Sequence, residues 1–187
     1  MASMTKFVVF FVGLFLVIDA KEIDVCSVQP PIKEDFELLK LSGRWYLFAS
    51  YTNMFEKVNT ERCYTYLMTV VGNDLYFTVT YIRDNKTSEE RHTLEGNLTS
   101  DPDSPGKVRI TMPAVGLDNT FNIVDAKYDD YVISYICDIS PGYKAQMVSI
   151  ITRDAHLSDA KKKGLLEKLK SLKIDTERLE FDSKENC

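Results

Sequence analysis

Hydrophobic and polar residues alternate with a period of two along most of the chain between Gly43 and Arg153, a pattern typical of β-strands with one buried face. Residues that favour turns interrupt the alternation at short intervals. The pattern predicts eight strands, at residues 43–52, 62–71, 75–83, 88–98, 108–112, 120–127, 131–138 and 146–153. Because the connections are short, we expect consecutive strands to pair antiparallel as a meander.

The period changes after the eighth strand. Ser158 is a suitable helix N-cap, and Leu165, Leu169 and Leu172 recur at helical spacing. This single apolar stripe predicts a helix that packs on the outside of the sheet, with Lys161–Lys163 on its solvated face. Residues 178–182 then indicate a short extended segment.

Eight antiparallel strands can close into a barrel that holds one small ligand, or they can form a sandwich. We expect an all-β fold, an eight-stranded antiparallel up-and-down β-barrel with one C-terminal α-helix packed outside it. Gly43 and Trp45 open the first strand, and Arg153 ends the last strand at the same end. Arg153 stacked on Trp45 and bonded to nearby carbonyls would close that end. The open mouth would consist of the loops at 52–61, 83–88, 113–119 and 138–144.

Alternation also assigns the faces of the strands. In the third strand Leu75, Phe77, Val79 and Tyr81 share the more apolar side, which we expect to face inward, and Tyr76 faces outward. Aromatic and methionine side chains give adaptable apolar contacts, and a few hydroxyls orient a ligand. The alternative is that many of them simply fill the barrel. The inward-facing residues that we expect to line a ligand pocket are Tyr66, Met68, Phe77, Val79, Tyr81, Leu94, Ile110, Met112, Phe121, Ser134, Ile136, Met147 and Ser149.

Two histidines are candidates for polar chemistry. His92 lies on the inward face of its strand near the mouth, where it is either a solvent-exposed rim residue or a ligand contact. Together with Glu90 it could meet an amine. His156 follows the last strand, and we expect it to be structural or solvent-facing.

The N-terminal residues predict a secretory signal at 1–20, because Lys6 precedes an apolar run too short to span a bilayer. Residues 21–187 then suffice for one domain. Asn85 and Asn97 begin Asn-x-Thr glycosylation sequons, which fit an extracellular location. An even number of cysteines in a secreted chain predicts two disulfides among Cys26, Cys63, Cys137 and Cys187, with three connectivities open.

Charge and motif content exclude several function classes. The formal net charge of −5 argues against nucleic acids and anionic membranes as partners, and no other apolar stretch is long enough to cross a membrane. Paired inward carboxylates, a metal-ligand histidine cluster and a glycine-rich phosphate loop are absent from the sequence, so we expect neither catalysis nor a required cofactor.

Three segments in order resemble the lipocalin family. They are Gly43-Arg44-Trp45-Tyr46, then Tyr128-Asp129-Asp130-Tyr131 ahead of the seventh strand, and Ile151-Thr152-Arg153. The resemblance covers essentially the whole of residues 21–187. One departure is the pair Ala126-Lys127, where the family often has Thr-Asp, and it puts any receptor-type role of that loop in doubt.

Within the family the chain is most similar to the apolipoprotein D-like branch, which includes insect bilin-binding proteins and crustacean carotenoid carriers, the crustacyanins. This resemblance implies the disulfides Cys26–Cys137 and Cys63–Cys187. It implies a secreted carrier of one small hydrophobic ligand, either a bilin or carotenoid pigment or a lipid, sterol or fatty acid. A few lipocalins are isomerases that use a free thiol in the barrel. The two implied disulfides would leave no free thiol in this chain.

The remaining alternative is an extracellular interaction protein, such as a salivary antagonist that sequesters a bioactive amine or lipid mediator, or a subunit of a pigment complex. Outward aromatic residues such as Tyr76 and Tyr135 are compatible with homo- or hetero-oligomers. They are also compatible with packing of the predicted helix, the interpretation that we prefer.

Overall fold

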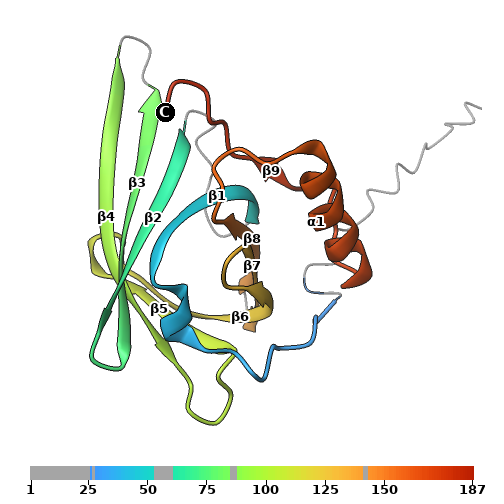
Figure 1. Ribbon diagram of the computed structural model, residues 1–187. Helices are drawn as coiled ribbons and strands as arrows, with labels where there is room; N and C mark the ends of the chain where they lie inside the picture. Colours follow the sequence, from blue (N-terminus) through green and yellow to red (C-terminus); the bar gives the residue numbers. More distant parts are fainter. Residues whose placement is uncertain (1–25, 27, 53–60, 85–87, 141–142) are drawn as a thin grey trace, which may run out of the picture.

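The computed structural model describes residues 26, 28–52, 61–84, 88–140 and 143–187, which form one curved antiparallel sheet with an α-helix beside it (Figure 1). The strands are β1 (Gly43–Thr52), β2 (Glu61–Val71), β3 (Asp74–Asp84), β4 (Glu89–Ser100), β5 (Lys107–Met112), β6 (Leu117–Lys127), β7 (Tyr131–Ser140), β8 (Tyr143–Thr152) and β9 (Glu180–Phe181). The helices are α1 (Asp159–Ser171) and the short 3-10 turns η1 (Leu38–Leu41) and η2 (Pro113–Val115).

Strands β1 to β8 close into a barrel. Each strand pairs with the next in antiparallel register, and β1 pairs with both β2 and β8, so the sheet has no free edge between the first strand and the eighth. The predicted fold class is therefore confirmed. Strand boundaries fall within three residues of those expected from the alternation, and the largest differences are the earlier starts of β6 at Leu117 and β8 at Tyr143.

Two apolar cores lie on opposite sides of the barrel wall. One fills the interior and includes Trp45, Leu75, Phe77, Val108 and Ile123. The other lies between the outside of the wall and the helix, and its wall residues come from β1, β6, β7 and β8. Strands β7 and β8 contribute to both cores, which explains why neither of their faces is polar in the sequence.

Residues before the first strand supply part of the interior core. Phe36, Leu38 and Leu41 are buried there, and η1 holds the two leucines against the inside of the barrel. This segment could not be predicted from the sequence, because four residues are too few to show a helical period.

Helix α1 packs on the outside of the barrel as expected, with Leu165 and Leu169 buried. The hydroxyl of Ser158 accepts a hydrogen bond from the backbone N–H of Lys161 and caps the helix. The prediction that Lys161 lies on the solvated face of the helix is wrong. Its Nζ lies 2.7 Å from the Asp130 carboxylate and 2.9 Å from the Asp154 carboxylate. This lysine therefore joins the start of the helix to the β6–β7 turn and to the segment after β8.

The C-terminal tail is fastened to the barrel. Strand β9 pairs with β1, and the backbone N–H of Cys63 donates to the carbonyl of Ser183. The disulfides are Cys26–Cys137 and Cys63–Cys187, the pairing that the family resemblance implies. Removing either bridge is expected to cost about 2–5 kcal/mol of stability.

Several expectations fall outside the described residues: the signal peptide at 1–20, the sequon at Asn85, most of the mouth loop at 52–61, and parts of the mouth loops at 83–88 and 138–144. Among the helices that the structure describes, none is both long enough and apolar enough to cross a membrane.

Candidate functional site

Trp45 and Arg153 lie together at one end of the barrel. Trp45 is fully buried, its indole Nε1 donates to the carbonyl of Leu41, and the Arg153 guanidinium lies 3.8 Å from its ring centroid. The guanidinium also donates to the carbonyls of Tyr128, Arg44 and Ser42, each at 2.9 Å. Burial lowers the pKa of Arg153, and these carbonyls compensate for the water that it has lost. This end of the barrel is closed by the contact that the sequence predicted.

The barrel brings the expected lining together on its inner face. Ten of the residues belong to the interior core or pack against it: Tyr66, Met68, Phe77, Val79, Leu94, Ile110, Met112, Phe121, Ile136 and Met147. Tyr81 is buried on the same face of β3. Ser134 and Ser149 are paired across β7 and β8, on the face that carries Ile136 and Met147, and the Ser134 hydroxyl donates to the Ser149 carbonyl at 3.5 Å.

Burial on this inner face changes along the barrel axis. Toward the closed end Trp45, Leu75, Val108, Ile123 and Val132 are 2 % accessible or less. Other inward-facing side chains are only partly buried: Tyr64, Met112 and Met147 near the open end, and Tyr66, Leu94 and Ile110 further along the same face. The closed end is therefore a packed core, whereas several positions further along the inner face leave apolar surface uncovered.

Three parallel rings stand side by side near the open end, on β2, β3 and β4. The Tyr64 and Tyr81 ring centroids lie 4.9 Å apart, and those of Tyr81 and His92 lie 5.2 Å apart. The Nε2 atom of His92 is buried and makes no hydrogen bond within the described residues, and its nearest charged neighbour is the Glu90 carboxylate at 3.6 Å. The His92 side chain is 32% exposed, so it lies at the rim with its ring stacked on Tyr81 and its Nε2 atom shielded from solvent.

Charged groups border this row of rings. Burial raises the pKa of Tyr64, and its hydroxyl donates to the Glu61 carboxylate, which raises the pKa further. The Arg83 guanidinium donates to the other oxygen of the same carboxylate. Tyr64 is therefore a neutral hydrogen-bond donor at physiological pH, and the local charges of Glu61 and Arg83 cancel.

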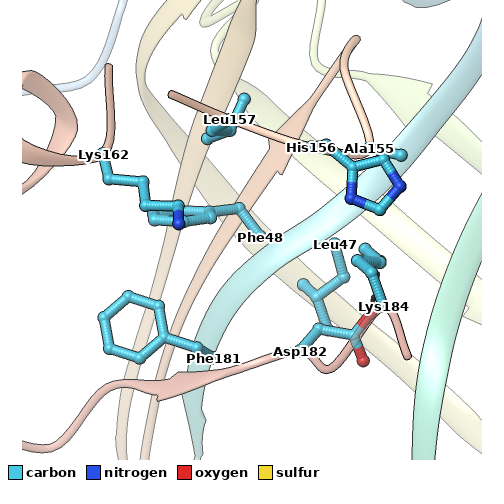
Figure 2. A pocket seen from close by; sticks show the side chains of 9 residues that line it. All are labelled: Leu47, Phe48, Ala155, His156, Leu157, Lys162, Phe181, Asp182 and Lys184. Atoms are coloured by element: carbon cyan, nitrogen blue, oxygen red, sulfur yellow. Dashed lines mark hydrogen bonds and ion pairs between the residues drawn. The ribbon is translucent and has the colours of Figure 1, made fainter. Parts of the chain in front are cut away.

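Other predicted residues lie outside the barrel. His156 is exposed and lines a pocket on the outer wall (Figure 2). Asn97 is half-buried on β4, and its carboxamide is hydrogen-bonded to Thr99 and Thr111.

Tyr135 is buried between the wall and the helix, and its hydroxyl donates to the carbonyl of Val28, whereas Tyr76 is exposed. Tyr135 is thus a packing residue and offers no surface for self-association.

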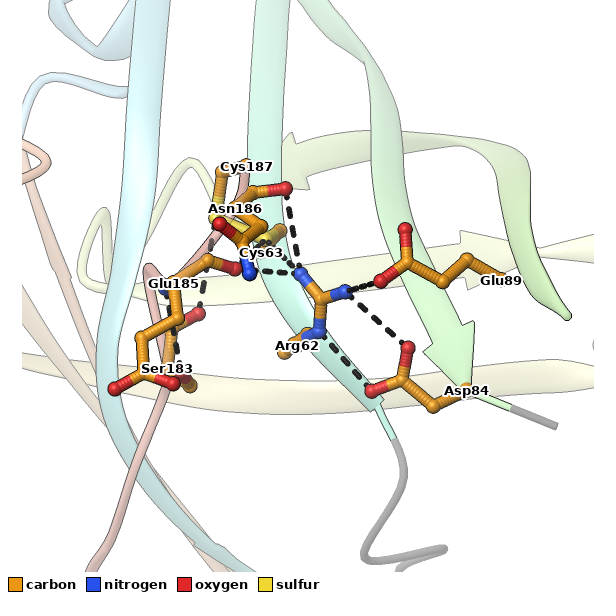
Figure 3. Close-up of polar contacts among 8 residues, drawn as sticks. All are labelled: Arg62, Cys63, Asp84, Glu89, Ser183, Glu185, Asn186 and Cys187. Atoms are coloured by element: carbon orange, nitrogen blue, oxygen red, sulfur yellow. Dashed lines mark hydrogen bonds and ion pairs between the residues drawn. A yellow bond between two sulfur atoms is a disulfide. The ribbon is translucent and has the colours of Figure 1, made fainter. Parts of the chain in front are cut away.

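Arg62 organises the rim of the open end beside this site (Figure 3). Its guanidinium donates to the Asp84 carboxylate at 3.0 and 3.2 Å, to Glu89 at 2.5 Å and to the backbone carbonyl of Glu185 at 2.6 Å. One arginine therefore connects the ends of β2, β3 and β4 to the C-terminal tail, next to the Cys63–Cys187 disulfide. The role of Arg62 could not be predicted from the sequence, because its partners are brought together only by strand pairing.

The site offers little catalytic chemistry. All four cysteines form disulfides, so the barrel holds no thiol nucleophile. Within the part of the chain that the structure describes, no group of three or more histidine, cysteine or carboxylate side chains is placed to hold a metal ion. The arrangement is that of an apolar container with a few neutral polar groups near its opening.

Comparisons with known proteins agree with this arrangement. The chain is 25% identical to apolipoprotein D of Cavia porcellus over 85% of this chain and 82% of that protein. It is also 26% identical to prostaglandin-H2 D-isomerase of Mus musculus, over 71% of this chain and 68% of the relative.

Solved structures show the same fold at lower identity. Insecticyanin from the tobacco hornworm Manduca sexta superposes with a TM-score of 0.67 at 19% identity, over 85% of each chain. Lobster apocrustacyanin A1 superposes with a TM-score of 0.60 at 22% identity, over 76% of this chain and 77% of the other. The model of the lipocalin / cytosolic fatty-acid binding protein family matches residues 42–185. This chain therefore belongs to the lipocalin family.

Proposed function

We propose that this lipocalin is a secreted carrier that binds one small hydrophobic molecule in the open half of its barrel. The observation that carries the proposal is that apolar side chains on the inner face of the barrel are not all packed: Tyr64, Met112 and Met147 stay partly uncovered near the open end. Uncovered apolar surface inside a protein favours an apolar occupant, because water there gains few hydrogen bonds.

The proposed ligand contacts are the inward-facing residues predicted from the sequence. Tyr66, Leu94, Ile110, Met112 and Met147 supply apolar area, and the hydroxyls of Ser134 and Ser149 lie on the same face. Near the opening, the Nε2 atom of His92 makes no hydrogen bond to the described residues and is suited to one polar group of the ligand, since a shielded ring nitrogen without a hydrogen bond is costly. A mostly apolar molecule with one polar end fits this distribution.

Two ligand classes satisfy that description, pigments of the bilin or carotenoid kind and lipids such as sterols or fatty acids. The first is supported by the resemblance to the branch that includes bilin-binding proteins and carotenoid carriers, and the second by the apolar lining alone. Secretion is supported by the two disulfides, by the sequon at Asn97 and by the N-terminal signal proposed for residues 1–20.

We favour binding over catalysis even though one relative is named as an isomerase. The four cysteines are bonded in pairs, so the thiol chemistry by which some lipocalins act has no nucleophile here. Titration of the native protein with a thiol reagent is expected to detect no reactive group.

The test is to purify the protein from its native source, record its near-ultraviolet and visible absorbance, and identify small molecules in an organic extract by mass spectrometry. We expect a stoichiometric hydrophobic compound. A visible band with a tetrapyrrole or carotenoid mass identifies a pigment carrier, and a colourless lipid identifies a lipid carrier. Native protein that yields no compound, and then binds none of these classes when they are added, contradicts the proposal.

A further inference from the structure

A pocket of about 430 Å³ lies on the outer wall of the barrel (Figure 2). It is formed by residues distant in the sequence: Leu47 and Phe48 of β1, Ala155, His156 and Leu157 of the segment after β8, Lys162 of α1, and Phe181, Asp182 and Lys184 of the tail. This volume is within the range of small-molecule sites. None of the proposed barrel contacts lines it, so it is a separate site.

The body of the pocket is apolar and includes an uncovered aromatic ring. The rings of Phe48 and Phe181 meet edge to face, with their centroids 5.4 Å apart. Leu157 packs against the outer core between the barrel wall and α1, to which Phe48 belongs. Phe181 is nevertheless 55% exposed. A large aromatic ring that is held in place on one side and open on the other offers a binding surface to a flat or aliphatic molecule.

The charges around the pocket favour an anion. Asp182 and Lys184 form an ion pair in which the Asp182 carboxylate is buried, and that carboxylate also accepts the backbone N–H of Tyr64. By contrast, the Lys162 side chain is exposed. Its ammonium lies 3.5 Å from the Asp159 carboxylate, which is fully exposed. Such a surface pair is weak, so Lys162 can exchange it for an anionic ligand. The exposed ring of His156 adds a hydrogen-bond donor at the same rim.

We propose that this pocket is a second ligand site, specific for a small amphipathic anion. The apolar body of the ligand would lie against Phe48 and Phe181, and its carboxylate or sulfonate would meet Lys162. The site stands independently of the barrel carrier function, since it shares none of the proposed barrel contacts.

The experiment uses the full mature chain and the probe 1-anilinonaphthalene-8-sulfonate, an aromatic anion. Amide chemical shifts followed by NMR during the titration locate the probe. We expect shifts at His156, Leu157 and Phe181, and at least tenfold weaker binding at these amides in Lys162→Glu and in Phe181→Ser. The matched control is Lys163→Glu, because Lys163 is on the same helix, is exposed and does not line the pocket. It should bind as the unchanged protein does.

A barrel variant separates this proposal from the carrier proposal. Tyr81→Arg is expected to leave the outer-wall shifts intact while it removes shifts at barrel-lining amides. Shifts confined to barrel-lining residues, or equal effects of Lys162→Glu and Lys163→Glu, would overturn the second site. Outer-wall shifts without any barrel binding would support the second site and count against the carrier.

Discussion

At the scale of single residues, the interior depends on close approaches that only particular side chains allow. Gly96 on β4 lies opposite Phe77 on β3. A Cβ placed on Gly96 would be 2.4 Å from the carbonyl oxygen of Thr111 and 2.7 Å from the Phe77 ring. The absent side chain therefore makes room for the Phe77 ring within the interior core.

Gly96→Ala is expected to destabilise the protein by about 1–3 kcal/mol, because the backbone oxygen of Thr111 cannot move without disturbing strand pairing. Urea unfolding provides the measurement. Gly164→Ala is the matched control: Gly164 is on α1 with open space around it, and alanine there should stabilise the helix by about 0.5–1 kcal/mol. Equal effects of the two substitutions would show that this close approach is unimportant.

At the scale of elements, α1 is attached to the barrel by buried leucines and by charges that reach across to β6 and β7. Lys168 lies 2.8 Å from the Asp125 carboxylate, which also accepts the Tyr131 hydroxyl at 2.9 Å. Burial alone would raise the pKa of Asp125, but the hydrogen bonds from Lys168 and Tyr131 outweigh it, and the pKa lies below its ordinary value of 3.8. The folded state therefore prefers the ionised carboxylate.

This preference predicts a pH-dependent contribution to stability. Because the pKa is lower in the folded chain, the stabilisation is complete above pH 3.8 and is lost as the pH falls through the lowered value. Asp125→Asn should therefore be less stable than the unchanged protein at neutral pH, and the difference should shrink in acid. Chemical unfolding at several pH values measures it, with the exposed Asp103→Asn as control. A difference that is the same at pH 7 and in strong acid would contradict the assignment.

The elements also show where sequence reasoning succeeds and where it fails. Strands such as β3 were predictable because strict alternation marks both their length and their inner face. Three other features were not predictable, because each depends on residues that become neighbours only after the barrel closes. They are the turn η1, the ion pairs of Lys161 and the contacts of Arg62. The disulfide pairing came from family resemblance, since spacing alone left three connectivities open. The outer-wall pocket combines four separate segments and leaves no local pattern.

At the scale of the whole molecule, the proposed function assigns stability to one end of the barrel and ligand binding to the other. The Trp45–Arg153 contact, η1 and the packed residues around Leu75 close one end. The open end carries the partly covered apolar lining, the ring stack and the Arg62 cluster that fastens the tail.

The measurement that tests this account most directly is the dissociation constant for biliverdin, a carotenoid and a long-chain fatty acid in the unchanged protein and in Tyr81→Arg and Met112→Arg. Both residues are on the inner face near the opening, so for the ligand that binds we expect at least a tenfold loss, about 1.4 kcal/mol, with the circular dichroism spectrum retained. Tyr76→Arg, an outward substitution on the same strand as Tyr81, should bind normally. Unchanged affinity in both inward variants, or no saturable binding by the unchanged protein, would contradict a ligand site inside the barrel.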